Sequence, residues 1–111
     1  MIEWIESCWH AIRGWFTPRR KVIIQAGDLL PAKLPRYDLI LLQDGGENWS
    51  VGFLCPCGCG DTIELLLLPN VKPQWDIRVD AQRRPTLTPS VWKTTGCKSH
   101  FWVREGKIIW V

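Results

Sequence analysis

The sequence predicts a mainly β fold: one small domain stabilised by a metal site, with an amphipathic helix at its N-terminus. Two observations support this prediction. Short apolar runs bounded by Gly, Pro, Asn and Asp recur along residues 21–111, as is typical of strands joined by turns. Three cysteines fall within residues 55–59, and a fourth lies at position 97, which is typical of a metal site.

The composition limits the classes of protein to which this chain can belong. Its 111 residues, 46% hydrophobic and 23% charged, suit one globular domain. We expect a helix over residues 1–17 and a zinc-binding β domain over residues 18–111. The formal net charge of +3 is too small to indicate a nucleic-acid partner, and none is expected. An odd, clustered set of five cysteines and no signal-like apolar run predict a cytoplasmic protein.

The N-terminal segment has the apolar periodicity of a helix. Its stripe recurs at steps of four, three and four residues and consists of Ile5, Trp9, Ile12 and Phe16. The helix should end at Thr17, because a residue before proline disfavours the α conformation. Our main hypothesis is a helix that packs on the sheet of its own domain. A docking helix for a partner protein and a helix lying at a membrane surface are the alternatives.

The β domain is expected to be an antiparallel sheet built from hairpins. The expected strands are residues 21–26, 37–43, 49–54, 62–68, 75–79, 100–104 and 107–111. Asp44-Gly45-Gly46 and Glu105-Gly106 supply tight turns, whereas two prolines predict a loop over residues 83–89. Strand alternation places Phe101 and Val103 on one face and His100 on the other.

The run Cys55-Pro56-Cys57-Gly58-Cys59-Gly60 is the strongest candidate for a functional site. It lies between two predicted strands, so we expect it at the tip of a hairpin. Thiolates are soft ligands that suit zinc, although this spacing differs from the usual pair of Cys-x-x-Cys knuckles. Cys97 is the expected fourth ligand and His100 is its competitor. A reactive thiol cluster and inert buried cysteines remain the alternatives.

A serine–histidine pair is a second candidate site. His100 can act as a general base, because imidazole titrates near neutral pH. Ser99 is its neighbour in sequence, but adjacent side chains on a strand point to opposite faces. Ser90 is free of that restriction. Asp61 or Glu64, beside the cysteine run, can orient the imidazole as the third member of a triad.

Residues 49–111 carry three motifs that are specific in combination. They are Phe53-x-Cys55-Pro56-Cys57-Gly58-Cys59-Gly60, then Pro85-Thr86-Leu87-x-Pro89-Ser90, then Cys97-x-Ser99-His100-Phe101-Trp102-Val103-Arg104-x-Gly106-x-Ile108-x-Trp110. Together these motifs resemble the small bacterial family catalogued as domain of unknown function 6527. Its members look like accessory proteins encoded beside bacterial ubiquitin-like conjugation enzymes. The resemblance implies that they act as peptidases that mature or remove the ubiquitin-like modifier.

The resemblance implies an enzyme, its cofactor and its partners. It implies a deubiquitinase-like peptidase with a serine–histidine mechanism on a zinc-stabilised scaffold, partnered by a ubiquitin-like protein and its conjugation enzymes. It marks a metal cluster of Cys55, Cys57, Cys59 and Cys97, and polar residues Ser90, Ser99 and His100. An extended modifier tail would dock along a sheet edge. Two alternatives remain: a non-catalytic zinc-binding interaction module, and a zinc-dependent hydrolase with Glu64 as the base.

Overall fold

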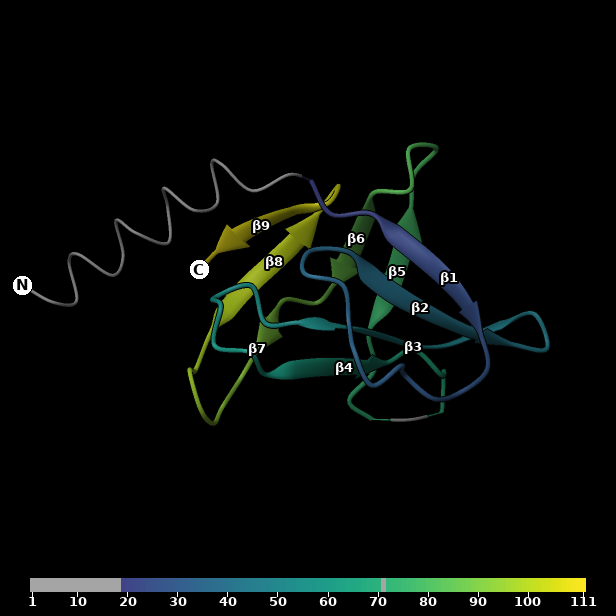
Figure 1. The fold of residues 1–111 in the computed structure, drawn as a ribbon, viewed down its shortest axis with the longest axis horizontal. Coiled ribbons are helices and arrows are strands. Elements are labelled where there is room, and N and C mark those ends of the chain that lie inside the picture. Colours follow the sequence, from purple (N-terminus) through teal and green to yellow (C-terminus); the bar gives the residue numbers. More distant parts are fainter. Residues whose placement is uncertain (1–18, 71) are drawn as a thin grey trace, which may run out of the picture.

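The computed structural model describes residues 19–70 and 72–111, which form nine strands in three small sheets (Figure 1). The prediction of a mainly β fold is confirmed for these residues. They contain no helix, and so none that is long and apolar enough to cross a membrane. The helix predicted over residues 1–17 lies outside the described residues.

The largest sheet contains the first four strands in sequence order. They are β1 (Val22–Ala26), β2 (Leu39–Asp44), β3 (Glu47–Leu54) and β4 (Thr62–Leu66). β1 runs parallel to β2, so the prediction of a wholly antiparallel sheet is wrong at this pair. The connection over residues 27–38 makes the parallel pairing possible, because about a dozen residues are enough for a crossover between parallel strands.

Tight turns join the antiparallel pairs of this sheet. Gly45 and Gly46 adopt φ values of 60° and 83°, which confirms the predicted turn between Asp44 and Glu47. β3 pairs with β4 in antiparallel fashion, and their last pair is Leu54 with Thr62. The cysteine run therefore lies at the tip of a hairpin, as predicted.

The second sheet pairs β5 (Asp76–Val79) with β6 (Pro85–Thr88) in antiparallel fashion. β6 lies where a loop was predicted, so that prediction is wrong for these four residues. Proline lacks the N–H that a sheet needs, but it is tolerated at the first position of a strand, which Pro85 occupies. One proline was therefore compatible with the strand that it had been expected to break.

The third sheet consists of β7 (Val91–Trp92), β8 (His100–Arg104) and β9 (Lys107–Trp110). β8 and β9 form the predicted hairpin around Glu105-Gly106, where φ is 49° and 76°. The predicted alternation is also confirmed, since Phe101 and Val103 are buried whereas His100 is only partly buried.

The three sheets share one core. The ring of Phe53 on β3 packs edge to face against Phe101 on β8, with centroids 6.3 Å apart. Side chains from eight of the nine strands bury together in this core: Val22, Leu39, Leu41, Val51, Phe53, Ile63, Leu65, Leu87, Val91, Phe101, Val103 and Ile108. Figure 1 shows β8 and β9 beside the chain entry into β1.

The turn between β8 and β9 is tied to two distant segments. The N–H of Arg20 donates to the carbonyl of Gly106 over 2.7 Å, and the N–H of Gly106 donates to the carbonyl of Pro85 over 2.8 Å. Gly106 has no room for a side chain, because a Cβ there would overlap the backbone oxygen of Arg20. Glycine at this position therefore allows the backbones to approach.

We predict that Gly106→Ala destabilises the protein more than Gly46→Ala. Both glycines have positive φ, so alanine at either should cost about 1–2 kcal/mol of conformational strain. Only at Gly106 does the new methyl group also meet backbone, which should raise the loss to about 3 kcal/mol or more. Denaturant unfolding of the two variants measures the difference. Equal losses would contradict the close approach.

Candidate active site and metal centre

The cysteine run begins where β3 ends. The N–H of Cys55 donates to the carbonyl of Asp61 over 2.8 Å, which closes the base of the knuckle, residues 55–60. Inside it, the N–H of Gly58 donates to the carbonyl of Cys55 over 3.1 Å. The N–H of Cys59 points at the sulfur of Cys57, 3.4 Å away. The backbone therefore turns so that the cysteine side chains gather on one side.

The four predicted cysteine ligands meet in space. The sulfur atoms of Cys55, Cys57, Cys59 and Cys97 all lie within 4.8 Å of one another. Cys55 Sγ lies 3.4 Å from Cys57 Sγ and 3.6 Å from Cys97 Sγ. Thiolates placed tetrahedrally about 2.3 Å from zinc would be about 3.8 Å apart. The cluster therefore fits a metal ion with four sulfur ligands, and His100 does not belong to it.

The cysteines of this cluster differ in acidity. Burial raises the pKa of Cys55 to about 12, against the opposing effect of its hydrogen bonds with the N–H of Cys57 and with Ser99 Oγ. Burial also disfavours the thiolate of Cys97, but hydrogen bonds from Ser99, Cys57 and Cys55 together outweigh it and lower the pKa to about 6. A metal ion binds thiolates, so its affinity should fall as the pH is lowered and protons compete.

Ser99 belongs to the surroundings of the four cysteines that form the candidate metal centre. Its side chain is buried, and its Oγ lies 3.1 Å from Cys97 Sγ and 3.6 Å from Cys55 Sγ. Groups that hydrogen-bond to metal ligands orient them and tune their charge. Of the two serines considered for catalysis, Ser99 is therefore the one that faces the sulfur cluster.

Ser90 and His100 form a close pair away from the sulfur atoms. Ser90 Oγ lies 2.9 Å from His100 Nε2. Ser90 lies in the connection between β6 and β7, and His100 is the first residue of β8, where it pairs with Trp92. A neutral imidazole that carries its proton on Nδ1 accepts the serine proton at this distance, as a nucleophile and its general base require.

Comparison with known protein families agrees with this geometry. Residues 26–111 match the family described as "Bacterial ubiquitination-like system serine protease (BubE)". The chain belongs to this family. The match confirms the predicted association with bacterial ubiquitin-like systems and is consistent with the predicted protease. The specific resemblance to domain of unknown function 6527 stays a prediction. No curated protein and no solved structure matches the chain significantly.

Two tryptophans contact the serine–histidine pair of this BubE family member, and neither was predicted from the sequence to lie there. The indole of Trp92 stacks on the imidazole of His100, with ring centroids 5.1 Å apart and planes 14° apart. Trp75 Nε1 donates to the carbonyl of Ser90 over 3.4 Å. The pairing of β7 with β8 decides the first contact. One sequence with eight tryptophans does not reveal which of them lie there.

Asp61 lies at the base of the knuckle and is exposed. Its carboxylate accepts a hydrogen bond from Lys93 Nζ, and this bond lowers the pKa of Asp61. Glu64 on β4 accepts a hydrogen bond from Ser50 Oγ over 2.9 Å. Within the described residues, neither carboxylate is hydrogen-bonded to His100, so their predicted part in a triad stays a prediction. The Asp61–Lys93 ion pair connects the knuckle to the residue that follows β7.

We predict that Cys59→Ser abolishes metal binding and lowers the melting temperature to that of the chelator-treated wild type. Cys59 is exposed, so the substitution removes little packing and reports mainly on the lost ligand. Metal analysis and thermal unfolding measure the two effects. Bound metal that is retained in full would contradict the four-sulfur site.

Ser99→Ala serves as the matched variant at the same centre. All four sulfurs remain, so the variant should keep one metal ion per chain. Loss of the hydrogen bonds to Cys97 and Cys55 should weaken metal affinity by about tenfold or more. Competition with a chelator of known affinity measures the change. Unaltered affinity would show that Ser99 has no influence on the ligands.

Proposed function

We propose that this protein is a serine peptidase that cleaves the peptide or isopeptide bond next to the C-terminus of a bacterial ubiquitin-like modifier. Ser90 is the nucleophile and His100 is the general base. The 2.9 Å contact between Ser90 Oγ and His100 Nε2 is the observation on which the proposal depends. The family to which the chain belongs is described as a serine protease of a bacterial ubiquitination-like system, which supports the same reaction class.

In this mechanism the proton moves between two atoms that are already in hydrogen-bond distance. Ser90 Oγ attacks the carbonyl carbon while its proton passes to His100 Nε2. The imidazolium then donates that proton to the leaving amine, which completes the acyl-enzyme. Water, activated by the same nitrogen, hydrolyses the ester and restores Ser90. In this proposal the indole of Trp92, stacked on the imidazole, helps to orient His100 for the transfer.

Zinc is the metal that we propose for the four cysteines, because an all-thiolate tetrahedral set is typical of structural zinc. When bound, zinc supplies a cross-link and no chemistry at the scissile bond. The cross-link joins the hairpin β3–β4 to Cys97, three residues before His100. The metal site therefore holds the beginning of the strand that carries the base.

The proposed substrate enters as an extended tail. β7 forms one edge of its sheet and follows Ser90 directly, so a tail that pairs with β7 would carry its carbonyl carbon toward Ser90. The ubiquitin-like protein is the proposed substrate, its conjugation enzymes are proposed partners, and the cytoplasm is the proposed location.

We predict that Ser90→Ala and His100→Ala each lower cleavage of a modifier precursor by about 10³-fold or more, with no further loss in the double variant. When two residues act as one catalytic unit, the losses of activity from their single substitutions do not add in the double variant. Both single variants should keep their metal ion and melting temperature, because neither residue belongs to the sulfur cluster. Single-turnover cleavage, metal analysis and thermal unfolding measure the three properties.

Ser99→Ala is the control for this experiment, and it should retain cleavage at saturating metal. If Ser99→Ala is as inactive as Ser90→Ala, the nucleophile is wrongly assigned. If His100→Ala loses its metal, His100 is a ligand and not a free base. If cleavage survives both Ser90→Ala and Ser99→Ala, the serine mechanism is wrong, which leaves the zinc-dependent hydrolase. If the wild-type protein never cleaves a precursor, the non-catalytic interaction module is the alternative that remains.

Trp92→Ala should lower kcat by about tenfold with little change in metal content, because the imidazole loses the ring that orients it. Trp92→Phe keeps an aromatic face and should recover most of that loss. Trp92 is 64% exposed, so neither variant should unfold the core. If phenylalanine is no better than alanine, stacking does not position His100.

A further inference from the structure

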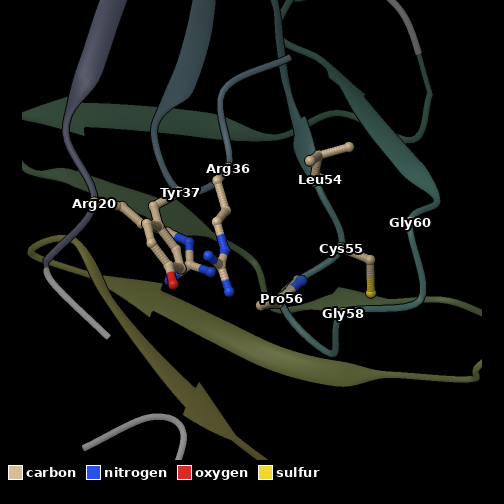
Figure 2. A pocket seen from close by; sticks show the side chains of 8 residues that line it. All are labelled: Arg20, Arg36, Tyr37, Leu54, Cys55, Pro56, Gly58 and Gly60. Carbon is tan, nitrogen blue, oxygen red and sulfur yellow. The ribbon is translucent and has the colours of Figure 1, made fainter. Parts of the chain in front are cut away.

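A cavity of about 220 Å³ lies beside the knuckle, outside the serine–histidine pair. Figure 2 shows Arg20, Arg36 and Tyr37 on one side of it and the knuckle, with Cys55, Gly58 and Gly60, on the other. Water occupies about 30 Å³ per molecule in the liquid, so this volume holds several waters or one small side chain. None of the proposed catalytic residues lines it.

Arg20 is the buried cation of this cavity. Its side chain is only 4% exposed, and its Nε atom is buried without a hydrogen-bond partner. The backbone N–H of Arg20 is bound to Gly106, which fixes the residue against the β8–β9 turn. A buried charged donor without a partner is costly. Proteins usually satisfy such a group, so the unpaired Nε of an arginine that lines a cavity indicates a missing acceptor.

Arg36 adds a second positive charge to the same cavity. The guanidinium carbons of Arg20 and Arg36 lie 5.6 Å and 5.1 Å from the centroid of the Tyr37 ring. Figure 2 shows the two guanidinium groups converging beside that ring. Arg36 is exposed, and within the described residues neither arginine forms an ion pair with a carboxylate.

Two groups near the cavity can attract Arg20 without forming an ion pair with it. Asp38 acts on Arg20 at a distance, while its Oδ1 accepts from the N–H of Lys21 over 3.1 Å. With a metal ion bound, the sulfur of Cys55 would be a thiolate and would also attract Arg20. A competing explanation is that the negative charge of a metal-bound sulfur cluster stabilises the charge of Arg20 from a distance. That explanation does not account for the position of the exposed Arg36 beside the same cavity.

We infer that this cavity binds a carboxylate of a polypeptide, on an acidic side chain or at a chain end. Guanidinium groups bind carboxylates through paired, charge-assisted hydrogen bonds, and an occupant carboxylate would satisfy Arg20 Nε and offset the repulsion between the two cations. The assignment to a polypeptide rests on the proposed function. Cys55 lines the cavity and lies in the cluster with Cys97, so the cavity and the strand of His100 adjoin the same metal centre.

Binding is tested in the metal-loaded Ser90→Ala protein by NMR titration of backbone amides. The probes are N-acetyl-aspartate amide, N-acetyl-glycylglycine, the amide of that dipeptide, and inorganic phosphate. We expect one or both carboxylate probes to shift the amides of Tyr37, Gly58 and Gly60, and the dipeptide amide to leave them unchanged. Tighter binding of the aspartate derivative assigns an acidic side chain. Tighter binding of the free dipeptide assigns a chain end.

Two variants complete the test. Arg36→Gln should weaken carboxylate binding by about tenfold, as the loss of a charge-assisted hydrogen bond predicts. Arg78→Gln removes an exposed arginine from β5 and should change nothing. Arg36 is exposed, so its variant should stay folded even if substitution of Arg20 does not.

Four results would overturn the inference. They are the absence of shifts, equal shifts from the dipeptide amide, tighter binding of phosphate than of either acid, and an Arg36→Gln variant that binds as the parent does. Ser90→Ala cannot complete the proposed reaction, so the titration reports on the cavity alone. A failed serine mechanism would leave it unaffected.

Discussion

The approach of four cysteine sulfurs within 4.8 Å is the constraint on which the rest of the site depends. Three sulfurs belong to the tip of one hairpin, and the fourth belongs to the segment that leads into β8. Four thiols this close compete for protons: burial raises the pKa of Cys55 to about 12, while hydrogen bonds bring that of Cys97 to about 6. A metal ion bound there would resolve that conflict, because it would stabilise every thiolate at once.

Strand alternation then separates two kinds of chemistry at the beginning of β8. Ser99 is buried against the sulfurs of Cys55 and Cys97, whereas His100 points to the other face, where Ser90 Oγ lies 2.9 Å away. One residue therefore faces the cysteine cluster, and the next takes part in the proposed reaction. Ser99, beside the cysteine cluster, and His100, the proposed base, are adjacent in the chain. Loss of a bound metal ion should therefore disturb the position of the imidazole as well.

The carboxylate cavity extends this coupling to the segment before β1. Arg20 lies between the cavity and the β8–β9 turn, because its side chain lines the cavity and its N–H donates to Gly106. The tight approach at Gly106 therefore has two consequences. It closes the hairpin that begins at His100, and it holds a buried guanidinium beside the knuckle. Residue 20 precedes the matched family region, residues 26–111, so the family resemblance does not extend to Arg20.

The sequence by itself determined the local features of this protein. Alternating apolar residues and turn glycines predicted most strands, the β8–β9 hairpin and the shared face of Phe101 and Val103, because these properties depend on neighbours in the chain. The thiols of the knuckle and of Cys97 were also identifiable, since few residue types bind soft metals. Tertiary structure alone decided the rest. The parallel pairing of β1 with β2, the strand at Pro85, the stacking of Trp92 on His100 and the pairing of Asp61 with Lys93 each join segments whose proximity depends on the whole fold. No local pattern specifies such contacts, because they follow from how three sheets bury one shared core.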